Sequence, residues 1–171
     1  MNRRVVRSAP AILGLLAIAG MLAIVAHNVR PTLRGRMLGR DGVVMQRTWR
    51  DCGLAAVATT LHALGMEVPD YAELLQRFPA PDDGFTMWQL KEIMSELGVV
   101  SVPWDLPAAS LDTVPTPAIV HLSQGHYVVL LTRRQHVWEI ADPMVGRMES
   151  TRRSVRHAFS GAALLMAGAE R

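Results

Sequence analysis

The chain has 171 residues, half of them hydrophobic, and a formal net charge of +3. This length fits one domain with an appendage, and the apolar content argues against intrinsic disorder. The single cysteine excludes an internal disulfide and any multi-cysteine zinc site. The basic side chains form no continuous face with aromatic platforms, so nucleic-acid binding is not predicted.

An apolar segment comes first in the chain. Residues 8–29 contain no Asp, Glu, Lys or Arg, and about 20 apolar residues are enough to cross a bilayer. The alternatives are a cleaved signal peptide or a buried helix, but the residues before His27 make a poor cleavage site. We therefore predict that residues 1–29 form a retained, single-pass anchor in a bacterial inner membrane, with the following domain on the periplasmic side.

A basic linker is expected next. Residues 30–42 include Pro31, Gly35 and Gly39 and show no apolar periodicity, which is typical of a juxtamembrane connection. The sequence therefore predicts that the domain occupies residues 43–171.

Three helices are predicted in the first part of this domain. Apolar residues recur at helical spacing from Cys52 to Leu64, and Gly65 follows as a stop signal. Asp70-x-x-Glu73 and Thr86-x-x-Gln89 resemble capping boxes, which open a second and a third helix. Gly98 closes the third.

The pattern changes after Gly98 to short apolar runs separated by turn formers. These runs predict strands at residues 99–102, 118–122, 127–131, 137–141 and 162–166. The connections within 118–146 are short enough to join antiparallel neighbours. Helices followed by a sheet indicate an α+β fold, with any site expected where the Cys52 helix meets the sheet.

Cys52 is a candidate nucleophile. A thiol in the first turn of a helix feels the helix dipole and unpaired backbone N–H groups, which favour the thiolate. The amide of Gln46, six residues earlier, could donate to an oxyanion. Asp51 is ambiguous, because its carboxylate could cap the helix or its charge could oppose ionisation of the thiol. By itself, a lone cysteine is more often an inert buried side chain.

A thiol nucleophile needs a base and a group that orients the base. Among the six histidines, His126 has the best setting, at the first residue of a hydrophobic strand. Asp142 ends the next strand and is the candidate orienting group, although Asp-Pro is also a plain turn signal. If the two strands form a hairpin around Arg133–Gln135, His126 and Asp142 lie roughly opposite each other.

Several motifs together resemble one known family. Gln46-x-x-x-x-Asp51-Cys52-Gly53-x-Ala55, Gly125-His126-Tyr127 and Asp142-Pro143-x-x-Gly146 are similar to the nucleophile, histidine and aspartate motifs of the bacteriocin-processing cysteine peptidases. Those enzymes cut after a double-glycine leader. Residues 159–165 are similar to the closing strand of the family, so the resemblance covers about residues 43–166.

The resemblance implies a papain-like cysteine peptidase fold and a function. Cys52 would attack the peptide bond after the leader, His126 would act as general base and then acid, Asp142 would orient His126, and Gln46 would share the oxyanion hole with the Cys52 N–H. Neither a metal nor another cofactor is implied. The expected partners are an exported peptide with a double-glycine-type leader and an export or secretion apparatus.

Two other functions remain open at this point. A thiol acyltransferase or transglutaminase-like enzyme uses the same Cys, His, Asp order and differs only in the acceptor. A non-catalytic module could hold a leader peptide for an export system. The chain departs from the best-known family members, which join the peptidase to a multi-span transporter with an ATPase domain, and this leaves the substrate open.

Overall fold

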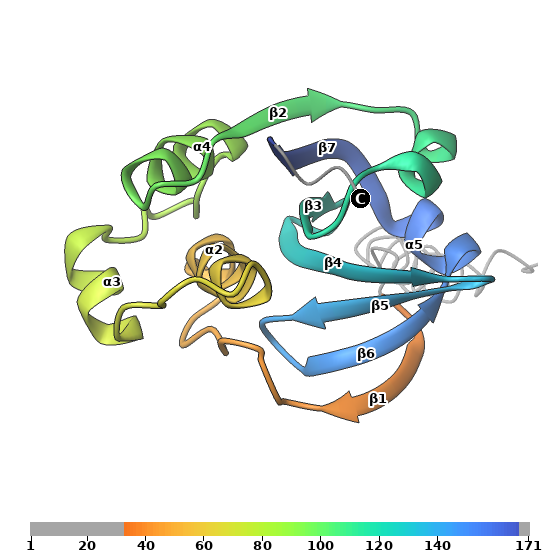
Figure 1. The fold of residues 1–171 in the computed structure, drawn as a ribbon, viewed down its shortest axis with the longest axis horizontal. Coiled ribbons are helices and arrows are strands. Elements are labelled where there is room, and N and C mark those ends of the chain that lie inside the picture. The colour runs from red at the N-terminus through yellow and green to blue at the C-terminus, as the bar shows by residue number, and fades with distance from the viewer. Residues whose placement is uncertain (1–32, 168–171) are drawn as a thin grey trace, which may run out of the picture. The chain divides into compact units, whose positions relative to one another are not determined.

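The computed structural model describes residues 33–167, and Figure 1 shows how their helices and strands are arranged. The predicted anchor, residues 1–29, lies outside the described residues and stays a prediction. Within residues 33–167, no helix combines the length and the apolar character needed to cross a membrane.

The three predicted helices are confirmed and follow an edge strand, β1 (Gly35–Gly39): α2 (Cys52–Ala63), α3 (Tyr71–Arg77) and α4 (Met87–Glu96). Both predicted capping signals begin a helix. The Asp70 carboxylate accepts hydrogen bonds from two backbone N–H groups of α3. Thr86 and Gln89 form a reciprocal capping box at α4. Local sequence therefore sets where α3 and α4 begin.

The rest of the domain is mainly an antiparallel sheet. Its elements are strand β2 (Ser101–Asp105), 3₁₀ helix η1 (Ala108–Thr113), strands β3 (Ala118–Leu122), β4 (His126–Arg134), β5 (Val137–Asp142) and β6 (Gly146–Thr151), helix α5 (Arg152–Ala158) and strand β7 (Phe159–Met166). In the described part of the chain, seven strands pair in the order β1-β6-β5-β4-β3-β7-β2, and every pair is antiparallel. The predicted α+β class is confirmed.

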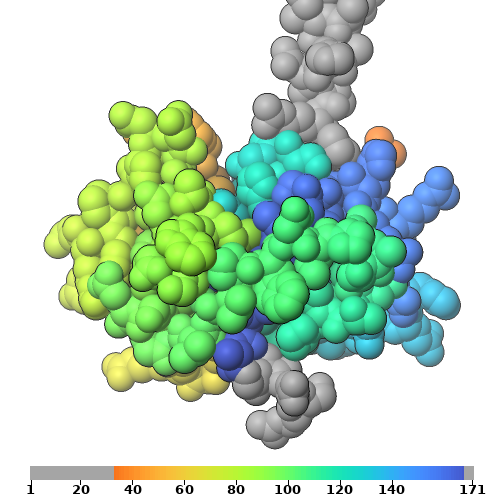
Figure 2. All heavy atoms as spheres, turned by 90° about the horizontal axis from the view of Figure 1, so that it is seen from above, coloured from red at the N-terminus to blue at the C-terminus, as the bar shows by residue number. Residues whose placement is uncertain are grey.

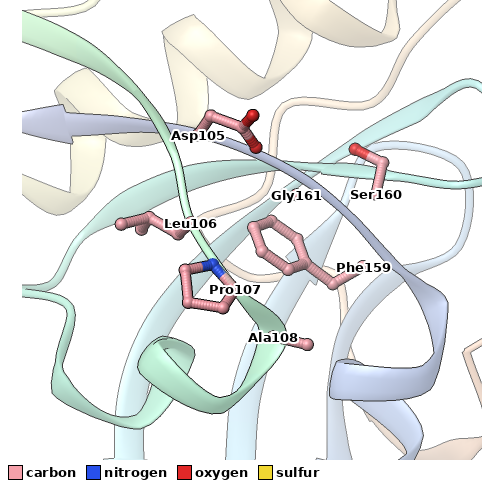
Figure 3. Close-up of a pocket in the computed structure, with 7 residues that line it drawn as sticks. All are labelled: Asp105, Leu106, Pro107, Ala108, Phe159, Ser160 and Gly161. Atoms are coloured by element: carbon pink, nitrogen blue, oxygen red, sulfur yellow. The ribbon is translucent and has the colours of Figure 1, made fainter.

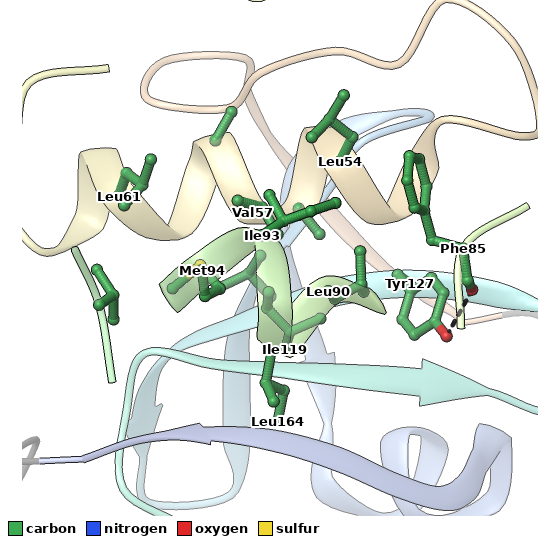
Figure 4. Packing of buried hydrophobic residues seen from close by; sticks show 14 of the residues in the cluster. Leu54, Val57, Leu61, Phe85, Leu90, Ile93, Met94, Ile119, Tyr127 and Leu164 are labelled. Atoms are coloured by element: carbon green, nitrogen blue, oxygen red, sulfur yellow. Dashed lines mark hydrogen bonds between the residues drawn. The ribbon is translucent and has the colours of Figure 1, made fainter. Parts of the chain in front are cut away.

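Helix α2 is buried on all sides over most of its length, from Cys52 to Leu61. Leu54, Val57 and Leu61 pack with Ile93 of α4 and with the sheet, as Figure 4 shows. A helix that is apolar all round needs partners on every side. Here α3, α4 and strand β4 supply them, and this fixes the start of α2 against the sheet.

The opposite face of the sheet is covered separately. Alternate residues of a strand point to opposite faces, so Val129 faces α2 while Val128 and Leu130 join a second core. Leu111 of η1 and Val155 of α5 close that second core. In Figure 2 the segments around α3 and α4, in yellow-green, lie beside β2 and η1, in green, on one continuous face. The sheet is therefore rigidly held on both faces, which positions the side chains at its rim.

The predicted linker, residues 30–42, needs a correction. Residues 35–39 form β1, which pairs with β6 and places Met37 opposite Met148. All five residues of β1 are exposed, which agrees with the absence of apolar periodicity in this segment. Its backbone nevertheless completes the sheet edge. Arg36 adds an ion pair with Glu149 at 2.7 Å. Backbone pairing at an edge needs no buried face, and the sequence pattern therefore missed it.

Strand β6 and helix α5 were not predicted either. Strand β6 alternates buried and partly exposed residues without forming an apolar run, and α5 has seven residues, of which only Val155 and Ala158 are buried. Both elements depend on tertiary packing more than on a local signal.

Candidate active site

Cys52 is the first residue of α2, and its side chain is only 4% exposed. The next residue is Gly53, and a Cβ at that position would meet the Leu90 side chain at 3.0 Å and Phe85 at 3.2 Å. A side chain there would push α2 away from α4. The glycine after the cysteine therefore lets the thiol-bearing turn pack closely against the neighbouring helix.

His126 and Asp142 meet at the rim of the sheet. His126 begins β4, Asp142 ends β5, and both side chains are buried. His126 Nε2 lies 2.7 Å from Asp142 Oδ1. The same oxygen accepts the backbone N–H of Met144 at 2.9 Å, which holds the carboxylate in place.

The hairpin itself differs from the expected register. Strand β4 continues to Arg134, and a register shift between Leu130 and Thr132 brings Val129 opposite Ala141. Continued from this pair, the ladder would place Asp142 opposite Val128, two residues beyond His126. The His126 and Asp142 side chains therefore meet along a diagonal, which is within reach of long side chains on adjacent strands.

The charge state of His126 follows from its surroundings. Burial lowers the pKa of the imidazole, but hydrogen bonds to Asp142 and Cys52, together with their charges, outweigh burial and raise the pKa of His126 to about 9. Nε2 is engaged by Asp142, so Nδ1 is the ring nitrogen left for the Cys52 thiol. The structure thus joins His126 to Asp142 by a hydrogen bond and places Cys52 near enough to raise the pKa of this histidine.

Gln46 lies in the loop before α2, and its backbone ties this loop to the rim. Its N–H donates to the carbonyl oxygen of Pro143 at 2.9 Å, next to Asp142. Its side-chain Nε2 donates to the carbonyl oxygen of Thr48 at 3.0 Å. Within residues 33–167, the buried Oε1 has no hydrogen-bond partner. An amide nitrogen carries two hydrogens, so one N–H of Gln46 remains for another acceptor.

The ambiguity over Asp51 is resolved by its contacts. Asp51 is the residue before α2, but its side chain makes no capping hydrogen bond to that helix. The carboxylate is 1% exposed and accepts from the backbone N–H groups of Arg47 and Thr48, the Thr48 hydroxyl and the Tyr71 hydroxyl. Burial raises the pKa of Asp51, but these hydrogen bonds outweigh it and hold the pKa below its usual value. Asp51 is therefore a buried, ionised anchor of the loop.

Sequence reasoning missed Tyr71. It starts α3, 20 residues after Asp51, and no local pattern connects the two positions. The one signal in the sequence was an acidic residue next to the candidate nucleophile, because a carboxylate that is buried on folding needs donors from somewhere in the fold. Only the tertiary structure shows that one of them comes from α3.

Other sites are less suited to chemistry. In the part of the chain that the structure describes, no three His, Cys, Asp or Glu side chains gather as a metal site. A cavity of about 410 Å³ opens beside β7, as Figure 3 shows, but none of the four candidate residues lines it. His121 is half-buried on β3, where a ring nitrogen lies 2.9 Å from the Ser160 hydroxyl.

Comparison with known proteins agrees with this geometry. The sequence pattern of the peptidase C39 family matches residues 40–171. The colicin V secretion/processing ATP-binding protein of Escherichia coli is 28% identical over 125 residues, which cover 73% of this chain and 18% of that protein. A Pseudomonas aeruginosa protein named "Probable functional amyloid protease" is 29% identical over 114 residues, covering 61% of this chain and 50% of that protein.

The fold has a counterpart among solved structures. The crystal structure of a double-glycine-motif protease from a transporter, in complex with the leader peptide, matches with a TM-score of 0.67. The match covers 81% of this chain and 97% of that one at 23% identity, which supports the shared fold. The chain spans about a fifth of the length of the colicin V protein.

Proposed function

We propose, because this chain belongs to the peptidase C39 family, that it is a cysteine peptidase with Cys52 as its nucleophile. The observation that carries the proposal is the hydrogen bond between His126 Nε2 and Asp142 Oδ1. This bond orients the imidazole so that its other nitrogen, Nδ1, is available to the Cys52 thiol. A nucleophile, a base and a group that orients the base are then linked in sequence.

The proposed reaction has two steps. The Cys52 thiolate attacks the scissile carbonyl, and the imidazolium of His126 gives its proton to the leaving amine as the carbon–nitrogen bond breaks. Water then attacks the thioester while His126 accepts a proton, and the carboxylic acid leaves as the thiol is restored. The pKa of about 9 keeps His126 protonated at neutral pH, ready for the first transfer.

We assign oxyanion stabilisation to two N–H donors, one at each end of the loop before α2. The Cys52 backbone N–H is at the first turn of α2, where helix N–H groups have no partner within the helix. The free N–H of Gln46 is the second donor. Removing one such donor from an enzyme that forms a tetrahedral intermediate costs on the order of 10²–10³ in kcat.

The proposed substrate is an exported peptide or protein with a double-glycine-type leader, cleaved after the second glycine. Two observations support this choice: the family match, and the leader peptide held in the crystal structure of the double-glycine-motif protease. The name of the colicin V protein joins processing to secretion, which supports an export apparatus as a partner.

Membrane attachment completes the proposal. The uncharged, apolar segment of residues 8–29 supports a single-pass anchor, and an extracytoplasmic domain is proposed with it. Fusion of reporter enzymes after residue 42 tests the orientation. Activity of an alkaline phosphatase fusion in the bacterial periplasm would support it, and activity only of a cytoplasmic reporter would reverse it.

The central experiment compares the full chain with its Cys52→Ala variant on a synthetic double-glycine leader peptide. Cleavage after the second glycine by the parent and its loss in the variant are expected, with peptide masses read by mass spectrometry. Cleavage that survives the substitution would remove Cys52 from the mechanism. An added primary amine separates hydrolysis from acyl transfer, because predominant formation of the amide product would indicate a transferase instead.

A further inference from the structure

The buried carboxylate of Asp51 is the starting point for a second assignment. It lies directly before the proposed nucleophile, yet its negative charge opposes ionisation of a neighbouring thiol. The electrostatic effect of Asp51 on Cys52 therefore has the wrong sign for activation. A buried charge persists only where several donors satisfy it, and the identity of these donors indicates what Asp51 does.

Three of the four donors lie in the loop that separates Gln46 from Cys52. Asp51 Oδ2 accepts the Arg47 N–H at 2.9 Å, and Oδ1 accepts the N–H and the hydroxyl of Thr48, both at 2.6 Å. The carboxylate thus folds the loop back on itself. Because the Thr48 carbonyl oxygen accepts from Gln46 Nε2, the loop also sets the direction of the Gln46 amide.

The fourth donor is Tyr71 at the start of α3. Its hydroxyl lies 2.7 Å from Asp51 Oδ2 and 3.2 Å from the Asp51 carbonyl oxygen. Burial raises the pKa of Tyr71, as does its hydrogen bond to Asp51, so the hydroxyl keeps its proton and remains a donor. The loop is thereby attached to a helix whose own start is fixed by the Asp70 cap.

The Asp51 carbonyl belongs to the same peptide unit as the Cys52 N–H. This carbonyl accepts the Ala55 N–H at 3.0 Å and also contacts the Tyr71 hydroxyl. In a trans peptide the C=O and N–H point in opposite directions. Donors that hold the Asp51 carbonyl therefore also fix the direction of the Cys52 N–H.

From these contacts we infer that Asp51 and Tyr71 form a positioning pair that preorganises both oxyanion donors of the site. One arm runs from Asp51 through Thr48 to the Gln46 amide, and the other runs through the Asp51–Cys52 peptide to the Cys52 N–H. The inference rests on the proposed function, since it assigns these groups to the same cysteine peptidase reaction. Neither residue touches the reacting atoms.

The first test is a double-mutant cycle in the full chain, with cleavage of a double-glycine leader peptide as the readout. Tyr71→Phe removes only the hydroxyl, and we expect kcat to fall about tenfold with KM nearly unchanged, as for an interaction made in the transition state. In a Gln46→Ala background, one of the two oxyanion donors that Tyr71 positions is already missing. There, Tyr71→Phe should lower kcat clearly less, by about threefold. Equal losses in the two backgrounds, or an unchanged kcat for Tyr71→Phe, would overturn the inference.

Tyr127→Phe is the matched control. The Tyr127 hydroxyl is also buried and donates to a backbone carbonyl, that of Phe85 at 2.9 Å, and among the described residues it makes no hydrogen bond to the loop before α2. Its removal should cost stability comparable to that of Tyr71→Phe while kcat stays within about threefold of the parent. If both variants lower kcat equally, the effect of Tyr71 is not specific to the loop and the assignment fails.

Asp51→Asn supplies the second readout, which a general loss of structure would not reproduce. The amide keeps the shape of the side chain but removes the charge and replaces an acceptor with a donor. We expect kcat to fall about 10- to 100-fold while alkylation of Cys52 by iodoacetamide keeps or gains rate at neutral pH, because a neighbouring negative charge is gone. A parallel fall in kcat and alkylation would contradict a positioning role.

These outcomes are separable from failure of the proposed function. If Cys52→Ala still cleaves the leader peptide, the proposed function fails irrespective of the cycle. If Cys52→Ala is inactive and the cycle shows no coupling, the function stands and the positioning pair is rejected.

Discussion

The loop before α2 with the first turn of that helix, and the rim formed by β4 and β5, each carry half of the proposed site, but they are held differently. The rim rests on a backbone ladder and on two apolar cores, with Val128 on one face and Val129 on the other. The loop depends on one carboxylate, Asp51, for three of its hydrogen bonds. A single polar change in the loop should therefore affect catalysis more than stability, whereas a core change near the rim should affect stability first.

The largest effect is expected at the rim, where Asp142 is functional as well as structural. Asp142→Ala should lower kcat about 10³-fold, because His126 loses the group that orients it. Asp142→Asn should retain more activity, since an amide oxygen can still accept from His126 Nε2 at the present 2.7 Å separation. Steady-state kinetics on a leader peptide measure both. Near-parental activity of the alanine variant would remove Asp142 from the mechanism.

The core under the nucleophile tests the other side of the comparison. Leu54 is fully buried in α2, so Leu54→Ala should lower the free energy of unfolding by about 3–4 kcal/mol. Thr48→Ala in the loop should cost only about 1–2 kcal/mol, yet lower kcat more than its stability loss explains. Urea unfolding and kinetics on the same preparations separate the two. A larger stability loss for Thr48→Ala than for Leu54→Ala would reverse the contrast.

The protonation of His126 makes the stability of the protein depend on pH. Its pKa of about 9 is above the unfolded value of 6.5, so the folded state binds the proton more tightly. The resulting stabilisation is fully present below pH 6.5 and is lost as the pH rises through about 9, on the order of 3 kcal/mol. Urea unfolding at several pH values should show this decline. Replacing His126 with Gln should flatten it, and an unchanged slope in that variant would assign the decline to other groups.

The smallest effect is expected at the outer edge of the sheet. The side chain of Arg36 is 72% exposed where it pairs with Glu149, so Arg36→Ala should change the free energy of unfolding by no more than about 0.5 kcal/mol. Cleavage should be unaffected, because β1 is at the edge of the sheet and two strands, β6 and β5, separate it from β4. A loss of several kcal/mol would indicate that β1 is more than an edge strand, and the comparison would need to include it.

Local signals in the sequence account for much of the fold. The capping residues Asp70 and Thr86 start their helices where the pattern predicted, and the apolar run at residues 118–122 is strand β3. The exposed strand β1 and the short helix α5 were missed because their stability comes from pairing and packing with distant segments. Propensity and periodicity carry no information about such partners.

The candidate site shows the same division. Cys52, Gln46, His126 and Asp142 could be selected from residue type, spacing and family resemblance, because a helix start and strand ends are local features. Their roles remain proposals. The register shift in the β4–β5 hairpin and the contact between Asp51 and Tyr71 could not be selected in this way.

Residue order alone specifies which chemical groups are available: one thiol, a histidine that opens a strand, an aspartate that ends one, and an amide six residues before the thiol. How these groups are held depends on the folded chain, which brings His126 and Asp142 together along a diagonal and closes the loop around Asp51. The physical reason is that a buried charge must find donors wherever the folded chain supplies them. One of these, the Tyr71 hydroxyl, comes from a helix 20 residues away.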